Sequence, residues 1–345
     1  MRKIAVDAMG GDNAPGSVVA GTVHAVQAAN ERFGVTLVGQ EDRIREELQR
    51  LRAESLPIEV VHAPEVIEMS DPPIDALRHK RASSIVRMAQ MHRDGQVDGM
   101  LSAGNTGAFT GASILTLGNL PGVLRPTIGV FIPKASGVTL LLDVGANVDC
   151  TPQQLVQFGI MGSIFVEVLL DKVNPRVGLL NIGEEASKGN KTTQETFHLF
   201  HETDLNFIGN VEGGEILKGA TDVIVCDGFV GNVLLKSVEA IISVFPKKFK
   251  EYLPHNPLGW LGLGMLLPTL YKLKKTFNYE EYGGVPLLGV NGVAIICHGS
   301  STPKAINRAI LEADRIIAQS LNEHIKKKLE SVLQKETTST TYQKA

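Results

Sequence analysis

The sequence predicts an α/β protein: a two-lobed, mostly parallel sheet with flanking helices. Short apolar runs rich in Val and Ile alternate with longer segments of helical period, which is the pattern of parallel strands joined by crossover helices. The chain has 345 residues, more than one hydrophobic core usually serves, so we expect two closely joined lobes. Hydrophobic residues make up 43% and charged residues 21% of the sequence, as in globular proteins, which excludes disorder as a description of the whole chain.

Each predicted element follows from a local pattern along the chain. The apolar runs that predict strands are 3–7, 35–39, 58–62, 98–102, 127–132, 138–143, 176–181, 206–209, 222–226 and 293–297. The segments of helical period lie near 15–29, 41–52, 82–93, 106–118, 152–170, 190–203, 231–250 and 303–329. Thr302 and Pro303 begin the last helix, because Thr caps free N–H groups and Pro fits the first helical position. We expect residues 1–330 to form one unit of two intertwined lobes, and the polar residues 331–345 to form a disordered tail.

Charge, cysteine content and apolar segments restrict the partners and the compartment. The net charge is −3, so the overall balance does not attract nucleic acid, and binding to an anionic surface would need a local patch. The three cysteines are too scattered for zinc-ligand spacing and too few for a disulfide framework, which favours a reducing cytoplasm. The N-terminus reads as a strand rather than a secretory signal, and no stretch approaches the ~18 apolar residues of a transmembrane helix. We therefore expect a cytoplasmic protein.

Glycine, hydroxyl and amide residues follow several of the predicted strands. Ligands bind beyond the carboxyl ends of strands in open α/β sheets, so a site is expected at these turns. Glycines let backbone N–H groups approach an anion, and the following helix adds the positive end of its dipole, which makes SAGNTGA and HGSST the best phosphate cradles. For any single turn the alternative is a tight connection with a capping residue. The residues expected to bind phosphate or substrate are Asp12, Ser102, Asn105, Thr106, Gly107, Asn147, Ser300 and Ser301.

The usual nucleotide and metal motifs are absent from the sequence. No G-x-G-x-x-G follows a strand and opens a helix, and residues 183–189 carry Ser-Lys-Gly where a P-loop has Gly-Lys-Ser/Thr. Zinc-ligand spacing, a G-x-S-x-G elbow and a cysteine-nucleophile signature are also absent. We therefore expect a reaction that uses no cofactor and no metal ion.

Ten short motifs in fixed order give a more specific indication. They are DAMGGDNAP, SAGNTGA, LLLDVGANVD, QFGIMGS, PRVGLLNIG, SKGN, FIGNVEG, DGFVGNV, YGG and HGSS, and the match that they indicate runs from about residue 3 to 325. Taken together they resemble the bacterial acyl-acyl-carrier-protein:phosphate acyltransferases, the PlsX family. The resemblance implies reversible transfer of a fatty acyl group from acyl-acyl carrier protein to inorganic phosphate, giving acyl phosphate for phospholipid synthesis. It also implies a homodimer with the isocitrate/isopropylmalate dehydrogenase-like fold, which phosphate acetyltransferases share.

The looser likeness to phosphate acetyltransferases indicates catalytic residues. Residues 227–236 resemble their Asp-x-x-x-Gly-Asn-x-x-x-Lys stretch, and the HGSS turn lies where they carry a Ser-Arg pair, although the Arg is absent here. Direct attack of phosphate on a thioester depends on positioning and oxyanion donors more than on a strong base. The candidates are Lys188 as the cation, His298 for proton transfer or phosphate contact, Asn232 as a neutral donor and Asp227 to orient Lys or His.

We expect the SAGNTGA turn, Lys188 and the HGSS turn to meet in one crevice. The alternatives are a solvated loop lysine for Lys188 and a satisfied strand-end histidine for His298. Asp143, after another predicted strand, fits the cap of a buried turn as well as it fits a functional role.

An apolar segment near 245–283 is unusual for an enzyme of this composition. The stretch PHNPLGWLGLGMLLPTLY contains the only tryptophan and lies between two lysine clusters, but it is too short to span a membrane. We expect a protruding helical segment that binds the membrane surface reversibly, with its lysines facing anionic lipid. The lipid-contacting residues would be Leu258, Trp260, Leu263 and Leu267. The alternative is a helical hairpin in the core or at a dimer interface. A membrane glycerol-3-phosphate acyltransferase acting downstream is then a candidate partner.

A basic run and two other functions complete the hypotheses. Because the resemblance makes the carrier protein an acidic partner, a local positive patch has to steer the encounter. Arg78, Lys80 and Arg81 form the densest such run outside the apolar segment, with a charged, solvated helix start as the alternative. The competing functions are a metal- or NAD-dependent dehydrogenase of the same fold and a noncatalytic scaffold on the membrane surface.

Overall fold

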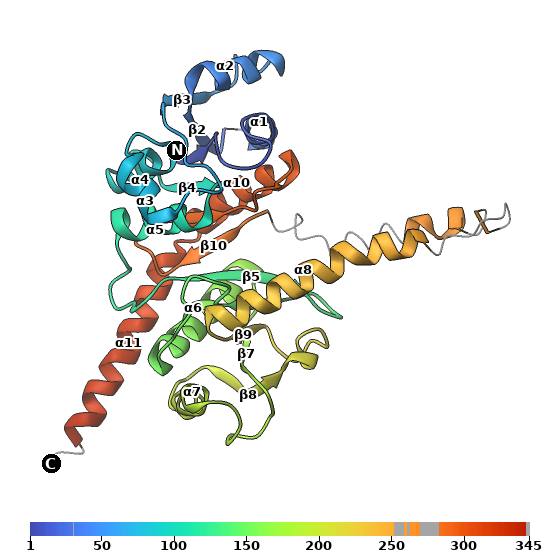
Figure 1. Cartoon of the computed structure of the whole chain (residues 1–345). Helices are drawn as coiled ribbons and strands as arrows, with labels where there is room; N and C mark the ends of the chain where they lie inside the picture. The colour runs from blue at the N-terminus through green and yellow to red at the C-terminus, as the bar shows by residue number, and fades with distance from the viewer. Residues whose placement is uncertain (30, 252–258, 261–262, 270–282, 343–345) are drawn as a thin grey trace.

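The computed structural model describes residues 1–29, 31–251, 259–260, 263–269 and 283–342, and it places helices on both faces of one sheet (Figure 1). The strands are β1 (Arg2–Asp7), β2 (Phe33–Gly39), β3 (Ile58–His62), β4 (Gly99–Ser102), β5 (Thr127–Pro133), β6 (Val138–Leu142), β7 (Arg176–Asn181), β8 (Asn206–Glu212), β9 (Val223–Val225), β10 (Val285–Leu288) and β11 (Ala294–Ile296). The helices are α1 (Gly16–Ala29), α2 (Glu41–Arg50), α3 (Pro73–His79), α4 (Ser84–Arg93), α5 (Thr106–Leu117), α6 (Pro152–Leu170), α7 (Lys191–His201), η1 (Gly213–Glu215), α8 (Gly228–Glu251), α10 (Pro303–Ala318) and α11 (Leu321–Tyr342). The predicted class, a mostly parallel α/β sheet with flanking helices, is confirmed.

The sheet changes strand direction at its centre. Its order is β3-β2-β1-β4-β11-β10-β5-β6-β9-β7-β8. Strands β3, β2, β1, β4 and β11 are parallel and form what we call the first lobe, and β6, β9, β7 and β8 are parallel and form the second lobe. Between the lobes, β10 is antiparallel to β11 and β5, and β5 is antiparallel to β6. Three reversals make the two lobes run in opposite directions, so their strands end at opposite edges of the sheet.

The hydrophobic core is divided by the two faces of the sheet rather than by the lobes. Ile4 packs on one face, whereas the next residue, Ala5, packs on the other, as successive residues of a strand must. Leu142 and Leu141 repeat this alternation in the second lobe and join the same two clusters. Side chains of α1, α6, α10 and α11 complete the first cluster, and side chains of α3, α4 and α5 complete the second. Because each cluster crosses both lobes, the lobes are packed together.

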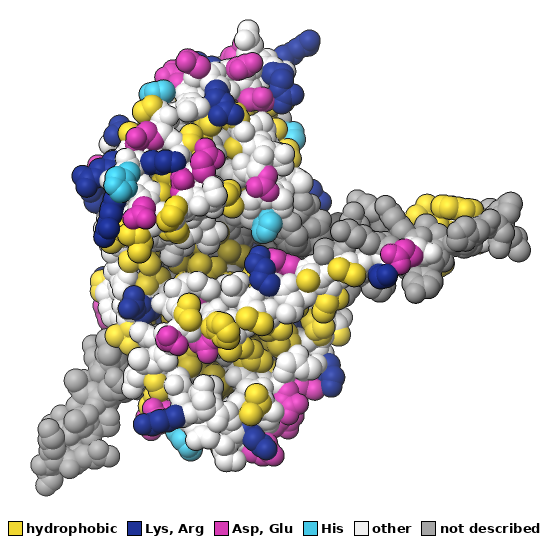
Figure 2. All heavy atoms as spheres, in the orientation of Figure 1, with side chains coloured by type: hydrophobic (Ala, Val, Ile, Leu, Met, Phe, Trp, Pro, Cys, Tyr) yellow, Lys and Arg dark blue, Asp and Glu magenta, His cyan; other side chains and the backbone are white. Residues whose placement is uncertain are grey.

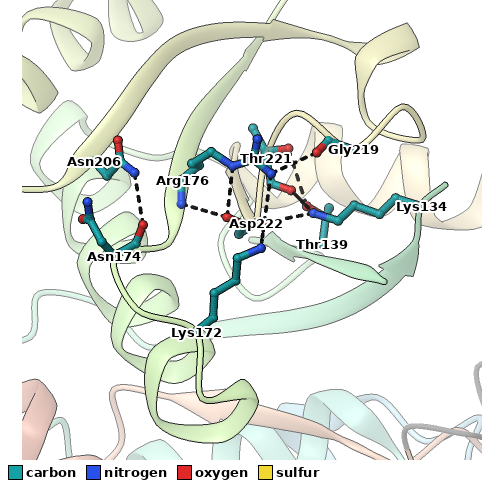
Figure 3. A network of polar contacts seen from close by, with 9 residues as sticks. All are labelled: Lys134, Thr139, Lys172, Asn174, Arg176, Asn206, Gly219, Thr221 and Asp222. Atoms are coloured by element: carbon teal, nitrogen blue, oxygen red, sulfur yellow. Dashed lines mark hydrogen bonds and ion pairs between the residues drawn. The ribbon is translucent and has the colours of Figure 1, made fainter. Parts of the chain in front are cut away.

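A polar network joins the amino ends of β6, β9 and β7 (Figure 3). Asp222 is 2% exposed and accepts from Lys134 Nζ at 2.9 Å and Lys172 Nζ at 2.7 Å. Arg176 adds bonds to the same carboxylate from its backbone N–H at 3.0 Å and from Nε at 3.2 Å. Burial acts to raise the pKa of Asp222, but these hydrogen bonds outweigh it and hold the pKa well below its ordinary value. The network therefore stabilises the second lobe with a buried carboxylate that has three cationic partners.

Helix α6 is the only described helix that is long and apolar enough to cross a membrane. Thr151 caps its start and Pro152 occupies the first helical position. Of the most apolar 18-residue stretch of this helix, 67% is buried inside the protein. Phe158 and Phe165 lie in the first of the two core clusters. Its apolar composition is therefore explained by its place in the core.

The structure differs from the sequence-based expectation in three places. The patterns do not predict β10 or α3, because β10 has only four residues and contains Pro286, and α3 has seven residues. The segment expected as one helix, 303–329, is broken at Ser320, whose φ of 50° lies in the left-handed region between α10 and α11. Helix α11 then continues to Tyr342, so most of the segment expected as a disordered tail is helical. The Lys, Glu and Gln residues up to Glu336 favour helix, whereas the Thr and Ser residues after it do not.

Candidate active site

Strand β1 ends in a buried carboxylate, Asp7, that organises the turn after the neighbouring strand β4. Ser102 Oγ donates to Asp7 Oδ2 at 2.6 Å and accepts from the Gly104 N–H at 2.9 Å. The other carboxylate oxygen accepts from the Met9 N–H at 3.1 Å. Burial raises the pKa of Asp7 against the opposing effect of hydrogen bonds from Ser102 and Ser84. One carboxylate therefore fixes both the β1–α1 loop and the β4–α5 turn.

Glycines in the β1–α1 loop let it pass between two other turns. A Cβ on Gly10 would lie 2.6 Å from the Gly104 nitrogen, closer than real Cβ atoms come to a backbone atom. Gly11 has a φ of 107° and faces the Gly299 carbonyl oxygen. The next residue, Asp12, is exposed and donates its N–H to that same oxygen at 2.8 Å. The glycines of DAMGGDNAP are thus required by the close approach of three loops.

The third of these loops follows β11. The Cys297 N–H donates to the Ser102 carbonyl at 2.8 Å, which places the loop beside the β4–α5 turn. His298 Nδ1 lies 2.8 Å from Ser300 Oγ and accepts from the Ser300 N–H at 3.2 Å. Ser301 is 5% exposed, and its N–H donates to the His298 carbonyl at 2.9 Å. We call residues 8–15, 102–107 and 297–302 the three-loop site.

Helix α5 begins at the three-loop site with a neutral cap. Asn105 Oδ1 accepts from the Ala108 N–H at 3.0 Å, and Asn105 Nδ2 donates to the carbonyls of residues 68, 69 and 71 at 2.9 to 3.3 Å. Thr106 and Gly107 occupy the first two helical positions, whose N–H groups have no acceptor within a helix. Both residues are exposed. The positive end of the α5 dipole and two N–H groups therefore face outward at this site.

The corresponding turn of the second lobe follows β6 and is also built on a buried carboxylate. Asp143 accepts from the Ile128 N–H at 3.1 Å, the Asn147 N–H at 2.6 Å and Asn147 Nδ2 at 3.0 Å. Burial raises the pKa of Asp143, although these hydrogen bonds oppose it. Asn147 Nδ2 also donates to the Pro126 carbonyl at 2.7 Å. Asp143 therefore caps a buried turn, one of the two interpretations that the sequence allows, and Asn147 is bonded into the same turn.

Helix α8 begins against this turn, and its cap carries a charge. Asp227 Oδ1 accepts from the Val230 N–H at 2.8 Å, which is the geometry of an N-cap. A Cβ on Gly228 or Gly231 would collide with backbone atoms of the turn after β6. The glycines of DGFVGN therefore let the first turn of α8 press against that turn, and Asn232 lies exposed beside it.

Lys188 lies exposed in the loop between β7 and α7. Its carbonyl accepts from Asn181 Nδ2 at 3.2 Å, and its N–H donates to the Glu185 carbonyl at 3.0 Å. Over the part of the chain that the structure describes, its ammonium makes no hydrogen bond or ion pair, and neither Asp227 nor His298 reaches it. We call Asn147, Asn181, Lys188, Asp227 and Asn232 the opposite-edge cluster.

The predicted site residues therefore fall into two groups. The three-loop site contains His298, Asp12, Ser102, Asn105, Thr106, Gly107, Ser300 and Ser301, whereas Lys188, Asp227, Asn232 and Asn147 belong to the opposite-edge cluster. The reversals at β10 and at the β5–β6 hairpin send the strands before Lys188 and the HGSS turn to opposite edges of the sheet, and the expectation that the two share one crevice stays a prediction. The sequence patterns do not single out Asp7. Its signal is an aspartate at the end of the run KIAVD, just before a glycine pair.

The basic residues predicted for docking have two different roles. Arg78 and Arg81 are exposed. Lys80 instead donates to Asp71 Oδ2 at 2.5 Å and to the Val66 carbonyl at 2.8 Å. This bond joins Lys80, which lies between the two arginines in sequence, to Asp71, whose carbonyl also accepts from the cap of α5. Lys80 is therefore a structural residue.

Exposed apolar side chains lie along and beyond α8. Trp260 and Leu267 are 55% and 57% exposed, and Leu263 is half-buried, whereas Leu258 lies outside the described residues. Phe229, in the first turn of α8, is 63% exposed. Figure 2 shows hydrophobic side chains gathered around the base of α8, where the helix leaves the body.

Comparison with known proteins places the chain in a family. Residues 2–324 match the model of the family described as "Fatty acid synthesis protein". The chain is 47% identical over 330 residues to a phosphate acyltransferase from Pelotomaculum thermopropionicum, with 96% of each chain covered. The chain belongs to this phosphate acyltransferase family. A phosphate acyltransferase from Brevibacillus brevis is also 47% identical, over 331 residues that cover 95% of this chain and 97% of the relative. The enzyme is therefore an acyltransferase of lipid synthesis, and its family resemblance is confirmed.

Solved structures of distant proteins share the fold of this phosphate acyltransferase. A phosphotransacetylase from Streptococcus pyogenes has a TM-score of 0.62 at 17% identity, over 92% of this chain and 94% of that chain. The EutD phosphotransacetylase from Staphylococcus aureus has a TM-score of 0.57 at 14% identity, with the same 92% and 94% covered. At such identities the likeness concerns the fold alone, and it confirms the fold expected from the likeness to phosphate acetyltransferases.

Proposed function

We propose that this phosphate acyltransferase moves a fatty acyl group reversibly from acyl-acyl carrier protein to inorganic phosphate. A phosphate oxygen attacks the thioester carbonyl carbon, and the carbon–sulfur bond breaks. The products are acyl phosphate, which enters phospholipid synthesis, and the carrier thiolate, which takes a proton from solvent. Direct attack needs a bound phosphate and donors for the oxyanion, and no step in it requires a cofactor.

The observation that carries this proposal is the neutral cap of α5. Asn105 satisfies the third amide of the helix without adding charge, which leaves the positive dipole end and the N–H groups of Thr106 and Gly107 for an anion. Helix α8, in contrast, begins at the carboxylate of Asp227, which already occupies the positive end of that dipole. We therefore assign phosphate to the three-loop site.

His298 is assigned to phosphate contact within this proposal. Its Nδ1 accepts from the Ser300 N–H at 3.2 Å, which holds the ring within the HGSS turn of the three-loop site. Asp227 acts as the cap of α8, and the exposed Lys188 and Asn232 are candidates for binding the acyl donor.

The test is to incubate the purified full-length enzyme with acyl-acyl carrier protein and phosphate. Free carrier thiol should appear only with phosphate, together with an acyl phosphate that hydroxylamine traps as a hydroxamate. Turnover should be unchanged in EDTA. Thiol release that is independent of phosphate, or activity lost in EDTA and restored by Mg²⁺ alone, would contradict direct attack. Neither a dehydrogenase nor a noncatalytic scaffold releases thiol in a phosphate-dependent way.

We propose that the acidic carrier protein docks on Arg78 and Arg81. Both are exposed, and Lys80 between them is bonded to Asp71, whose carbonyl accepts from the cap of α5, so a docked carrier would present its thioester at the three-loop site. Changing both arginines to Glu should raise the KM for acyl-acyl carrier protein and leave the KM for phosphate unchanged, and added salt should shrink the difference. An equal rise in both KM values would rule out docking at this patch. Lys80 is left intact because its replacement would disturb the fold.

We propose that the enzyme is a cytoplasmic homodimer that binds the inner face of the cell membrane peripherally through the segment near 245–283. The exposure of Trp260 and Leu267 supports this, and a long-chain acyl phosphate would be handed over there to a membrane glycerol-3-phosphate acyltransferase. Changing Leu263 and Leu267 to Glu should release the enzyme from anionic vesicles in sedimentation and keep turnover in solution. Loss of folding or of the dimer would place the segment in the core or at the interface.

A further inference from the structure

Asp7 is a buried carboxyl group that no charged partner faces among the described residues. The groups that contact it are the hydroxyls of Ser102 and Ser84 and backbone N–H groups such as that of Met9. The buried Asp222 of the second lobe, in contrast, has three cations around it. Burial of a carboxylate without a cation is unfavourable unless its hydrogen bonds compensate. The hydrogen bonds that Asp7 makes therefore have to compensate for its burial.

These bonds set the direction of a hydrogen-bond chain. Ser102 has one hydroxyl proton, and the 2.6 Å bond to Asp7 Oδ2 takes it. The Ser102 Oγ lone pair then accepts the Gly104 N–H at 2.9 Å. Because Ser102 is 2% exposed and its proton is already donated, it has no donor to offer to a phosphate. It acts on the turn that leads into α5.

We propose that Asp7 is a positioning residue of the phosphate site, which acts through Ser102 to fix the turn that presents the Thr106 and Gly107 N–H groups to the anion. The same carboxylate holds the Met9 N–H, so it also sets the β1–α1 loop on the other side of the turn. The inference rests on the proposed function, because it assumes that the anion bound at the three-loop site is the phosphate substrate.

The first test is a double-mutant cycle with Asp7→Asn, Ser102→Ala and both changes together. Each single change should raise the KM for phosphate about tenfold, with smaller changes in kcat and in the KM for acyl-acyl carrier protein, because the turn moves while the acyl donor site does not. The double variant should be no worse than the more damaged single variant, since both changes break the same chain of bonds.

Asp314→Asn is the matched control for loss of a buried aspartate. Asp314 is 5% exposed and accepts from Arg2 Nε at 2.6 Å, at the opposite end of the same strand β1. Its replacement should lower the Tm and leave the KM for phosphate unchanged. A purely structural role for Asp7 would give the same result as this control.

Sulfate, used as a competitive inhibitor, gives a second readout that does not depend on the ionisation of phosphate. As the pH falls and Asp7 takes up a proton, the bond that Ser102 donates to it weakens, because a neutral carboxyl group is a poorer acceptor than a carboxylate. Sulfate inhibition of the wild-type enzyme should then weaken relative to that of Asp7→Asn. The other loops at the site carry two titratable groups, Asp12 and His298, which are present in both enzymes. Their effect therefore cancels in the ratio of the two inhibition constants for sulfate.

The outcomes separate this inference from the proposed function. An unchanged KM for phosphate in both single variants, additive losses in the double variant, or a ratio of sulfate inhibition that is constant with pH would overturn it. If Asp7→Asn does not fold, Ser102→Ala, which keeps the carboxylate, decides by the same KM. If the wild-type enzyme releases no thiol in the presence of phosphate, the proposed function fails, and calorimetry of sulfate binding to the same variants still tests the effect of Asp7 on the anion.

Discussion

The three-loop site and the opposite-edge cluster share a local plan and differ in what they can bind. Each has a buried aspartate at the end of a strand, Asp7 at β1 and Asp143 after β6, and each uses glycine to bring another segment close to it. The helix that begins beside Asp7 is α5, which follows β4 and is capped by the amide of Asn105, whereas the helix that begins beside Asp143 is α8, which follows β9 and is capped by the carboxylate of Asp227. The charge of one capping residue therefore decides which turn favours an anion.

The exposed side chains around the two sites also differ. Large apolar side chains stand exposed around the opposite-edge cluster: Val148 at 61%, Ile182 at 81% and Phe229 at 63%. The three-loop site presents glycine, serine and threonine together with the exposed Asp12 and His298, and one exposed apolar side chain, Met69 at 50%, lies against Gly299. A glycine-rich turn at a strand end is therefore not enough to define a phosphate site. The cap and the neighbouring side chains determine its chemistry.

The largest expected effect compares the buried carboxylates of the two lobes. Asp222→Asn leaves Lys134, whose side chain is 4% exposed, without its counter-charge, and should lower the free energy of unfolding by about 3 kcal/mol. Asp204→Asn, which breaks an exposed pair with Lys328, is the control and should change it by less than about 1 kcal/mol. Urea denaturation at neutral pH measures both. Equal losses would show that burial of the Asp222 network contributes nothing.

Asp222→Asn and Asp7→Asn carry pH predictions of opposite sign for the two lobes. The pKa of Asp222 is lowered on folding, so its stabilisation is present above its ordinary pKa of 3.8 and is lost as the pH falls below that value. The pKa of Asp7 is raised, so the stability that this group favours is present below 3.8 and is lost as the pH rises through its folded pKa. In denaturation across pH, the difference in free energy of unfolding between wild type and Asp222→Asn should therefore become smaller in acid. Any loss of free energy of unfolding in Asp7→Asn relative to wild type should become smaller as the pH rises.

The next largest effect concerns the close approach of α8 to the turn after β6. A Cβ on Gly231 would overlap the Asp143 carbonyl oxygen, so Gly231→Ala should lower the free energy of unfolding by about 2–3 kcal/mol through a forced shift of backbone. Gly213→Ala is the control, because a Cβ there meets nothing within 4 Å. Thermal denaturation measures both variants. A Gly231→Ala protein as stable as the control would mean that the contact is looser than the geometry indicates.

The parts that could be predicted from the sequence are those set by neighbouring residues. The run KIAVDA becomes β1 because its alternate side chains fill both faces of the core, and Thr302 and Pro303 begin α10 as their capping chemistry requires. The division of the site into two edges could not be predicted. It depends on β10, four residues interrupted by Pro286, and on which neighbours that short strand joins. Lys188 and His298 both follow apolar runs, and only the strand order shows that they leave the sheet at opposite edges.

A kinetic effect of intermediate size tests the anion site itself. Thr106→Pro removes one N–H from the start of α5 and should raise the KM for phosphate about tenfold, because that N–H would donate to the anion. Proline fits this first helical position, and Asn105, with φ of −58° and ψ of 106°, already has an extended backbone that suits a following proline. Lys191→Pro makes the same change at the start of α7 and should leave the KM unchanged. Similar KM values for both variants would argue against phosphate at α5.

The smallest expected effect is that of Asp227→Asn, which tests whether the start of α8 takes part in the reaction. Asn caps helices about as well as Asp, and its Oδ1 can still accept the Val230 N–H, so the free energy of unfolding should change by less than about 0.5 kcal/mol. Turnover should stay within about twofold, because the proposed mechanism binds phosphate at the other edge of the sheet and Asp227 touches no reacting atom in it. Steady-state kinetics and thermal denaturation of the same preparation check both statements. A folded Asp227→Asn enzyme that has lost a hundredfold or more in turnover would make Asp227 a catalytic residue and move the reaction to the start of α8, and the argument from the neutral cap of α5 would then fail.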